Sequence, residues 1–173
     1  MRTFLGAVVL VFSLGCLVIP GEAGNTSSII IVEGAKQSTK KIKKEELDCM
    51  ASNIYFEAAT QSRIGKIAVA QVTMNRVNSK KFPNSVCEVV FQGPHNPKNP
   101  KACQFSWYCD GKPDVIRNKR TWRECVYVAK YVMLGGVPDI TLSSTHYHAK
   151  YVNPWWAKKM KMTIAVEDHI FYR

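Results

Sequence analysis

Glu57 is the residue of this sequence whose surroundings best suit acid catalysis. It lies three residues after Ile54 and seven after Met50 in a segment with helical spacing, so it belongs to the edge of an apolar stripe. Burial against apolar side chains raises the pKa of a carboxyl group, because it disfavours the charged form. A glutamic acid that stays protonated near neutral pH can protonate the leaving oxygen of a glycosidic bond. The spacing therefore makes Glu57 a candidate general acid, although a half-exposed glutamate without a catalytic role is the more ordinary interpretation of the pattern alone.

A second set of side chains has the types that bind sugars. Aromatic rings stack on sugar faces, and amide and hydroxyl groups form directed hydrogen bonds. The residues of these types are Gln104, Ser106, Trp107, Tyr108, Tyr147, Tyr151, Trp155 and Trp156. The same aromatic rings could instead fill the core, and their composition alone does not separate the two interpretations.

The elements that would position these residues are mainly helical. Apolar spacings of three and four residues predict helices over 45–60, 64–77, 84–91 and 118–134. The second helix is apolar around most of its circumference, so we expect it in the middle of the core, with Ser62 as its cap. Pro83 is expected to open the third helix.

Three segments are predicted to be strands. Residues 104–108 alternate polar and aromatic side chains, and residues 141–149 and 163–171 have strand-like patterns near the C-terminus. Because helices dominate and the sheet is small, the predicted fold class is α+β.

The N-terminus has the pattern of a signal peptide over residues 1–23. A basic start precedes an apolar run from Phe4 to Ile19, and small residues follow. An uncleaved membrane anchor is the alternative, although the run is shorter than the ~20 residues that span a bilayer. We expect residues 24–44 to form a linker or flexible arm and residues 45–173 to form one catalytic domain.

Charge and cysteine content agree with export. A net charge of +11 suits an anionic partner, and for an exported chain the cell envelope fits better than nucleic acid. Two disulfides and one free thiol are expected in an oxidising compartment, with the pairing left open. The five cysteines after residue 23 are Cys49, Cys87, Cys103, Cys109 and Cys125. Of these, Cys103 and Cys109 could close a small loop.

Short segments over residues 46–173 also match a known pattern in chain order. The first are Tyr55-Phe56-Glu57-Ala58, residues 65–72, Asn75-Arg76-Val77 and residues 82–92. The later ones are Gln104-Phe105-Ser106-Trp107, Asp110-Gly111, residues 145–149 and residues 169–172. Together they resemble the catalytic domain of the cell wall hydrolase family that is named for the spore cortex-lytic enzymes.

The resemblance implies a lysozyme-like fold in which a small antiparallel sheet forms one side of a substrate cleft. It also implies that the glycan strand of peptidoglycan is cleaved between N-acetylmuramic acid and N-acetylglucosamine, by a lytic transglycosylase or a muramidase, without a cofactor or metal. Glu57 would be the catalytic acid. The implied substrate contacts are Gln104, Phe105, Ser106, Trp107, Tyr147, His148 and Tyr172. Such an enzyme would be exported to the periplasm, cell wall or medium and act as a monomer, whether for phage lysis or for bacterial wall remodelling.

One position departs from the family's pattern. The family's E-A-x-x-E motif has a second Glu four residues after the first, and this sequence has Gln61 there. A lytic transglycosylase needs only one acid, because the 6-hydroxyl of muramic acid attacks the anomeric carbon. If water attacks instead, Asp110, Asp114 or Asp139 would have to assist. The sequence leaves the choice between these two reactions open.

Two other functions are compatible with the residues. His146 and His148 share one face of a predicted strand, and with Asp168 or His169 they could hold zinc in an N-acetylmuramoyl-L-alanine amidase. Hydrogen bonding in a cleft or core is the more ordinary use of such histidines. A non-catalytic binder of the cell wall would rest on the positive charge and on exposed aromatic residues.

Overall fold

The computed structural model describes residues 41–93 and 103–173. The predicted signal peptide and residues 24–40 of the predicted arm lie outside these residues. The elements, in chain order, are α1 (Lys44–Ala58), α2 (Arg63–Val77), α3 (Val86–Val90), the 3₁₀ helix η2 (Ser106–Cys109), α4 (Lys119–Met133), β1 (His146–Ala149), the 3₁₀ helix η3 (Ala157–Lys159), β2 (Met162–Val166) and β3 (His169–Tyr172). No helix in the described ranges has the length and apolar character that crossing a membrane requires.

The predicted helices are confirmed, and side-chain caps fix where they begin. Ser62 caps α2 by accepting a hydrogen bond from the Ile64 amide at 3.2 Å. Asn118 caps α4 by accepting from two amides of its first turn, each at 3.0 Å. The prediction that Pro83 opens the third helix is wrong, because Ser85 caps α3 and accepts from the Glu88 amide at 3.3 Å.

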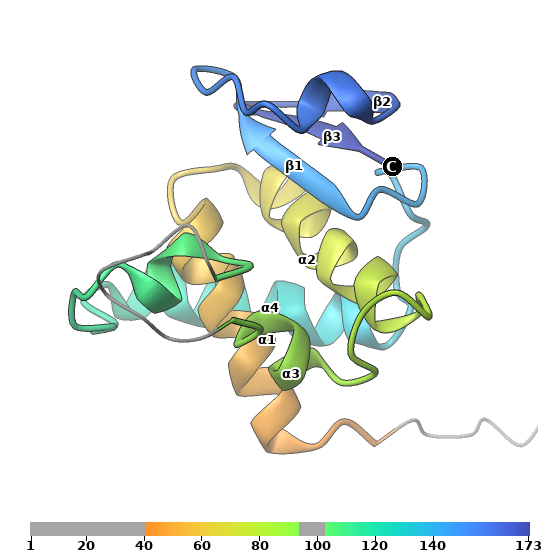
Figure 1. Cartoon of the computed structure of the whole chain (residues 1–173). Coiled ribbons are helices and arrows are strands. Elements are labelled where there is room, and N and C mark those ends of the chain that lie inside the picture. The colour runs from red at the N-terminus through yellow and green to blue at the C-terminus, as the bar shows by residue number, and fades with distance from the viewer. Residues whose placement is uncertain (1–40, 94–102) are drawn as a thin grey trace, which may run out of the picture. The chain divides into compact units, whose positions relative to one another are not determined.

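Helix α2 lies in the middle of the domain, as its apolar circumference predicted. It packs against α1, α3 and α4 on one side and against the sheet on the other, an arrangement that Figure 1 shows. Ala68 and Val72 contact Val166 and Phe171 of the sheet, and all but Val166 of these four are completely buried. The helix therefore joins the helical part of the core to the sheet.

In the described part of the chain, the sheet contains three antiparallel strands in the order β1-β3-β2. The prediction of one strand over residues 163–171 is wrong, because the chain reverses between β2 and β3 at Glu167, which has a φ of +48°. The strand predicted over residues 141–149 is confirmed only for its second half, β1. Among the strands of the described residues, β1 pairs with β3 alone and so lies at one edge of this three-stranded order.

The prediction of a strand over residues 104–108 is also wrong. Residues Ser106–Cys109 form the 3₁₀ helix η2, and a disulfide between Cys103 and Cys109 closes this segment into a loop. A second disulfide joins Cys49 to Cys87, and Cys125 is buried and unpaired among the described cysteines. The expectation of two disulfides and one free thiol is thus confirmed for this part of the chain.

Candidate active site

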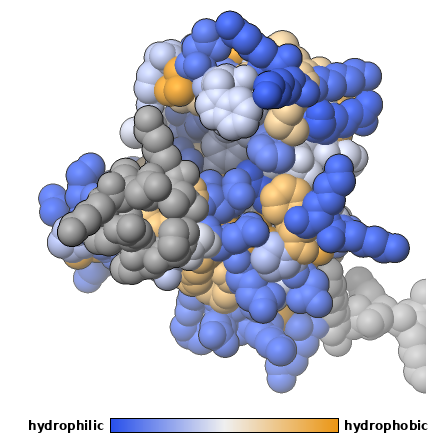
Figure 2. Space-filling model, in the orientation of Figure 1, coloured by the Kyte–Doolittle hydropathy of each residue, from blue (hydrophilic) through white to orange (hydrophobic). Residues whose placement is uncertain are grey.

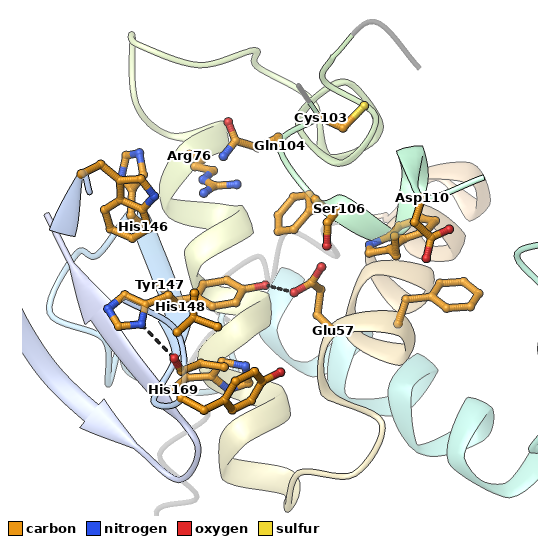
Figure 3. Close-up of a pocket in the computed structure, with 17 residues that line it drawn as sticks. Glu57, Arg76, Cys103, Gln104, Ser106, Asp110, His146, Tyr147, His148 and His169 are labelled. Atoms are coloured by element: carbon orange, nitrogen blue, oxygen red, sulfur yellow. Dashed lines mark hydrogen bonds between the residues drawn. The ribbon is translucent and has the colours of Figure 1, made fainter. Parts of the chain in front are cut away.

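A cleft of about 680 Å³ lies along β1, with Glu57 among its lining residues. Helices α1 and α2 and the loop that contains η2 line it from one side, and β1, His169 of β3 and part of the β1–β2 connection line it from the other. Figure 3 shows side chains from both sides pointing toward the same space. The sheet therefore forms one side of the cleft, as the resemblance implied.

Glu57 lies in the last turn of α1 and is only partly exposed. The Tyr147 hydroxyl donates a hydrogen bond to Glu57 Oε2 at 3.0 Å (Figure 3). Burial raises the pKa of the Glu57 carboxyl, and the hydrogen bond from Tyr147 and the charge of Arg76 oppose this rise without cancelling it. Glu57 thus has the position and the raised pKa that a general acid requires.

Tyr147 keeps its proton over a wide pH range. Burial and the nearby carboxylate raise the pKa of the Tyr147 hydroxyl well above its usual value. Its ring packs against His169 and Phe171, with centroids 5.1 and 5.6 Å away. Tyr147 is therefore a fixed hydrogen-bond donor to Glu57 and not a proton acceptor in the cleft.

Arg76 is a cleft residue that sequence reasoning did not single out. Its side chain is only 3% exposed, and its Nε donates to the Thr145 carbonyl at 2.6 Å. Gln104 Oε1 accepts from Arg76 Nη2 at 3.0 Å and from Nη1 at 3.3 Å in the amide orientation that satisfies both groups. Burial lowers the pKa of Arg76 to about 10, so it stays charged at neutral pH. Arg76 thereby connects the two sides of the cleft.

The predicted substrate contacts near η2 differ in whether their side chains offer polar groups to the cleft or pack in the core. Gln104, Phe105, Ser106 and Trp107 all line the cleft. Phe105 is 3% exposed and its ring lies 5.0 Å from the Arg76 guanidinium. Trp107 is held in the core, because its Nε1 donates to Asn53 Oδ1 at 3.0 Å and its ring stacks on Phe56. Gln104 and Ser106 therefore supply the polar groups here.

The predicted substrate contacts near the C-terminus also differ in whether they line the cleft. Tyr147 and His148 line the cleft, whereas Tyr172 does not. Tyr172 is buried behind His148, and its hydroxyl lies 2.9 Å from His148 Nε2. Tyr172 is thus placed to orient His148 and not to contact a ligand in the cleft directly.

Of the three aspartates that could assist an attacking water, only Asp110 lines the cleft. Its Oδ1 accepts from the Lys112 amide at 2.9 Å, and its Oδ2 lies 3.5 Å from Lys112 Nζ. Asp139 instead accepts hydrogen bonds in the turn that precedes β1, including one from the Ser143 amide at 2.8 Å. The second carboxyl group that could serve an incoming water is therefore Asp110.

Gln61, at the position of the family's second Glu, does not line the cleft. Its Nε2 donates to Asp168 Oδ2 at 3.0 Å, and its Oε1 accepts from the Asp168 amide at 3.4 Å. Next to it Ser62 donates to Glu167 from both its amide and its hydroxyl. A Cβ on Gly65 would lie 2.5 Å from Glu167 Oε2 and 2.8 Å from Gln61 Cβ, so a larger residue there would have to displace these side chains. Gln61 therefore fastens the α1–α2 turn to the β2–β3 turn.

Restoring the family's Glu, as Gln61→Glu, is expected to destabilise the domain without raising activity. The new carboxylate would face Asp168 and lose the amide's donor, at a cost of about 1 kcal/mol, or roughly 3–5 °C in Tm. Thermal unfolding at pH 7 measures this cost. Gln61→Ala, which removes the hydrogen bonds without adding charge, separates repulsion from lost bonding. Higher activity in Gln61→Glu would contradict the position of this side chain outside the cleft.

The histidines do not assemble the metal site of the amidase alternative. In the antiparallel register Ala149 pairs with His169, so His169 shares a face with Tyr147 and not with His146 and His148. In the described part of the chain, no three His, Cys, Asp or Glu side chains are grouped closely enough to hold a metal ion. Burial, with the charge of Arg76, lowers the pKa of His146 to about 4. His146 is therefore neutral near pH 7.

A carboxyl group with a raised pKa in an open cleft is typical of enzymes that use acid catalysis. This molecule has such a carboxyl group and cleft, in a helical domain with a small sheet. It therefore corresponds to this class of enzyme. The chain belongs to the Cell Wall Hydrolase family, whose model matches residues 60–172. This match begins just after Glu57, so the role of Glu57 depends on the geometry described above.

A spore cortex-lytic enzyme is similar to part of the chain. The chain is 34% identical over 71 residues to the spore cortex-lytic enzyme of Oceanobacillus iheyensis, a match that covers 41% of this chain and 23% of that protein. The chain thus spans only a minor part of this relative's length.

Two solved structures share the fold. The catalytic domain of the germination-specific lytic transglycosylase SleB from Bacillus anthracis has a TM-score of 0.59 at 23% identity, over 78% of this chain and 98% of that one. The catalytic domain of the Bacillus cereus SleB protein has a TM-score of 0.57 at 23% identity, over 82% of this chain and 99% of that one. These likenesses confirm the predicted fold class, a mainly helical domain with a small antiparallel sheet.

Proposed function

We propose that this chain is an exported enzyme that cleaves the glycan strand of peptidoglycan between N-acetylmuramic acid and N-acetylglucosamine, with Glu57 as general acid. The observation that carries the proposal is the Glu57 carboxyl in the cleft, which has a raised pKa and a hydrogen bond from Tyr147 at 3.0 Å. Family membership and the printed activity of the SleB structure, a lytic transglycosylase, support peptidoglycan as the substrate.

In the proposed reaction Glu57 gives up one proton and regains one, so it ends in its starting form. Glu57 protonates the glycosidic oxygen while the bond from this oxygen to the anomeric carbon breaks. The carboxylate that forms is stabilised by the Tyr147 hydroxyl and by the charge of Arg76, both of which favour the ionised form of Glu57. The same carboxylate then accepts the proton of the 6-hydroxyl as this oxygen attacks the anomeric carbon. The products are a 1,6-anhydro sugar and a new chain end.

Transglycosylation is the form of the reaction that we favour. The position of the family's second Glu is occupied here by Gln61, which binds Asp168 outside the cleft. Asp110 is the carboxylate that could instead activate water, and it already interacts with Lys112. An internal hydroxyl nucleophile needs no second carboxylate.

We further propose that residues 1–23 direct export, that residues 24–44 link them to the domain, and that residues 45–173 form the catalytic unit. Two disulfides in the described residues support this proposal, because such bonds persist in oxidising compartments. Mass determination of the mature protein's N-terminus after secretion tests the cleavage. If the protein is recovered from membranes with residues 4–19 still attached, the uncleaved anchor is favoured instead.

Mass spectrometry of the fragments from digested sacculi tests the reaction itself. A lytic transglycosylase releases 1,6-anhydro-muropeptides, and a muramidase releases the same fragments with reducing ends. An amidase would release free stem peptides and leave the glycan strand whole. Binding to sacculi without release of any fragment would indicate the non-catalytic alternative and contradict the proposal.

Chelation is expected to leave the digestion rate unchanged. Glu57 supplies the proton in the proposed reaction, and His169 lies on the sheet face opposite His146 and His148. Sacculi are digested before and after overnight treatment of the protein with EDTA. A rate that falls and returns when zinc is added would support the amidase instead.

A further inference from the structure

The connection between β1 and β2, residues 150–161, carries positive charge beside the cleft. It holds Lys150, Lys158, Lys159 and Lys161 and no acidic residue. Glu167 and Asp168 of the following β2–β3 turn are bonded to the α1–α2 turn instead, because Glu167 accepts hydrogen bonds from Ser62 and Asp168 accepts one from Gln61. Figure 2 shows strongly hydrophilic residues at the sheet end of the domain, around paler ones of intermediate hydropathy.

This connection is anchored to the cleft by Trp156. The Trp156 ring contacts His146, His148 and Tyr172, with centroid distances of 5.5, 5.7 and 5.5 Å. Trp156 and the nearby Tyr151 and Val152 all line the cleft. A ligand in the cleft would therefore meet the lysine-bearing connection.

Two aromatic rings of the connection are unusually exposed. Tyr151 is 90% exposed and Trp155 is 73% exposed. Lys159 Nζ lies 5.0 Å from the centroid of the Trp155 ring, so an ammonium group and an aromatic face are presented together. Exposed apolar surface bordered by polar groups is typical of an interaction site.

Among the described residues that line the cleft, the permanently charged cation is Arg76, and it is already bonded to the protein. The guanidinium of Arg76 donates to the Thr145 carbonyl and to Gln104. The lysines of the connection are exposed beside the cleft and are placed to meet an anionic substituent on a bound strand. In peptidoglycan, the lactyl group of muramic acid carries a short peptide with free carboxylates, and the sugar rings offer faces for stacking.

We propose that the β1–β2 connection binds the stem peptide of the glycan strand through carboxylate–lysine contacts, with Trp155 stacking on the strand. The enzyme would then prefer peptide-bearing glycan to glycan from which the peptides have been removed. This inference rests on the proposed function, because it assigns a substrate preference to the same cleft.

The test compares two substrates that differ only in the stem peptides. Sacculi are first freed of phosphate-containing polymers, and half are then stripped of peptides with an amidase. The parent protein is expected to show the higher kcat/KM on the peptide-bearing half. The double variant Lys158→Gln/Lys159→Gln should lose about twofold to about thirtyfold on that half, as two exposed ion pairs allow, and change little on the stripped half. Added salt should also reduce the parent's preference for the peptide-bearing half, because it screens the lysine–carboxylate contacts.

A matched control removes the same charge elsewhere. Lys119→Gln/Lys130→Gln changes two exposed lysines of α4, which packs against α1 and α2, and should leave both rates unchanged. Trp155→Ala should lower the rate on both substrates, since stacking involves the sugar.

Two results would overturn the stem-peptide assignment. One is an equal loss on both substrates in the Lys158/Lys159 double variant, and the other is no loss on either. A preference that appears only when phosphate polymers are retained would assign the lysines to phosphate and contradict the proposal. If the parent protein digests neither substrate, the proposed function itself fails, which is a different outcome from any of these.

Discussion

Replacing Glu57 by Gln is expected to abolish the digestion of sacculi while the domain stays folded. Gln keeps the shape of the side chain and can still pair with the Tyr147 hydroxyl, but it has no proton to give to a glycosidic oxygen. Loss of a general acid typically costs ~10²–10⁴ in rate. Release of soluble glycan fragments measures the activity, and circular dichroism and thermal unfolding establish that the variant is folded.

The same variant should also differ from the parent in its pH-dependent stability. Burial raises the pKa of Glu57 in the folded state, so the parent loses stability as the pH rises through that raised value and the carboxylate forms. Gln does not titrate and escapes this loss. The Tm of Glu57→Gln minus that of the parent should therefore increase from pH 4 to pH 8.

Glu45→Gln is the matched control for both measurements. Glu45 is exposed in the first turn of the same helix, α1, and does not line the cleft. This variant should keep full activity, and the pH dependence of its stability should stay close to the parent's. A folded Glu57→Gln protein that still digests sacculi would contradict the central assignment.

The helices could be predicted because their information is local. Apolar spacing marked α1, α2 and α4 to within a few residues, and Ser62 and Asn118 mark where α2 and α4 begin. The position of Glu57 at the edge of a buried stripe followed from the same spacing. Periodicity therefore sufficed for the helical part of the core, whereas the choice of Glu57 as the candidate acid also needed the resemblance to the family.

The segment at Gln104–Tyr108 shows where periodicity misleads. Alternating polar and aromatic residues suggested a strand, but the Cys103–Cys109 disulfide closes the segment over a separation of six residues, and η2 forms within it. Trp107 is held there by Asn53, which lies 54 positions earlier in the chain. Neither constraint can be derived from a five-residue pattern.

The β2–β3 turn depends equally on distant contacts. Glu167 and Asp168 interrupt the apolar pattern only briefly, and what holds the turn is its bonding to Ser62 and Gln61, more than one hundred positions earlier. The local pattern therefore predicts one long strand where two short ones form.

The position of Arg76 in the sequence could have identified it as a buried residue that needs partners. It follows Val69 by seven residues and Val72 by four, so it lies on a stripe of α2 that is otherwise buried. A charged residue on such a stripe needs buried partners, and here they are Thr145 and Gln104. Those partners come from two separate loops, which spacing along one helix does not indicate.

Replacing Tyr147 by Phe is expected to slow the enzyme and to move the alkaline limb of its pH profile to higher pH. The Tyr147 hydroxyl donates to Glu57 Oε2 at 3.0 Å and lowers the pKa of that carboxyl against the effect of burial. Without this donor the pKa of Glu57 rises further, so the acid keeps its proton to higher pH. The carboxylate that forms during bond cleavage also loses its partner. A hydrogen bond to a charged group is worth about 1.5–3 kcal/mol, which corresponds to a roughly 10- to 100-fold lower kcat at the optimum.

The two effects distinguish a direct contact with Glu57 from a purely structural role. Phe keeps the ring that packs against His169 and Phe171, so the fold should survive. Tyr55→Phe is the matched control, because the Tyr55 hydroxyl accepts a hydrogen bond from the Asn118 amide at 3.0 Å and its loss should lower Tm without moving the limb. The readout is kcat and kcat/KM for fragment release from pH 4 to pH 9. An unchanged limb with full activity would show that the phenol does not act on Glu57, and a shift to lower pH would show that it favours the protonated acid.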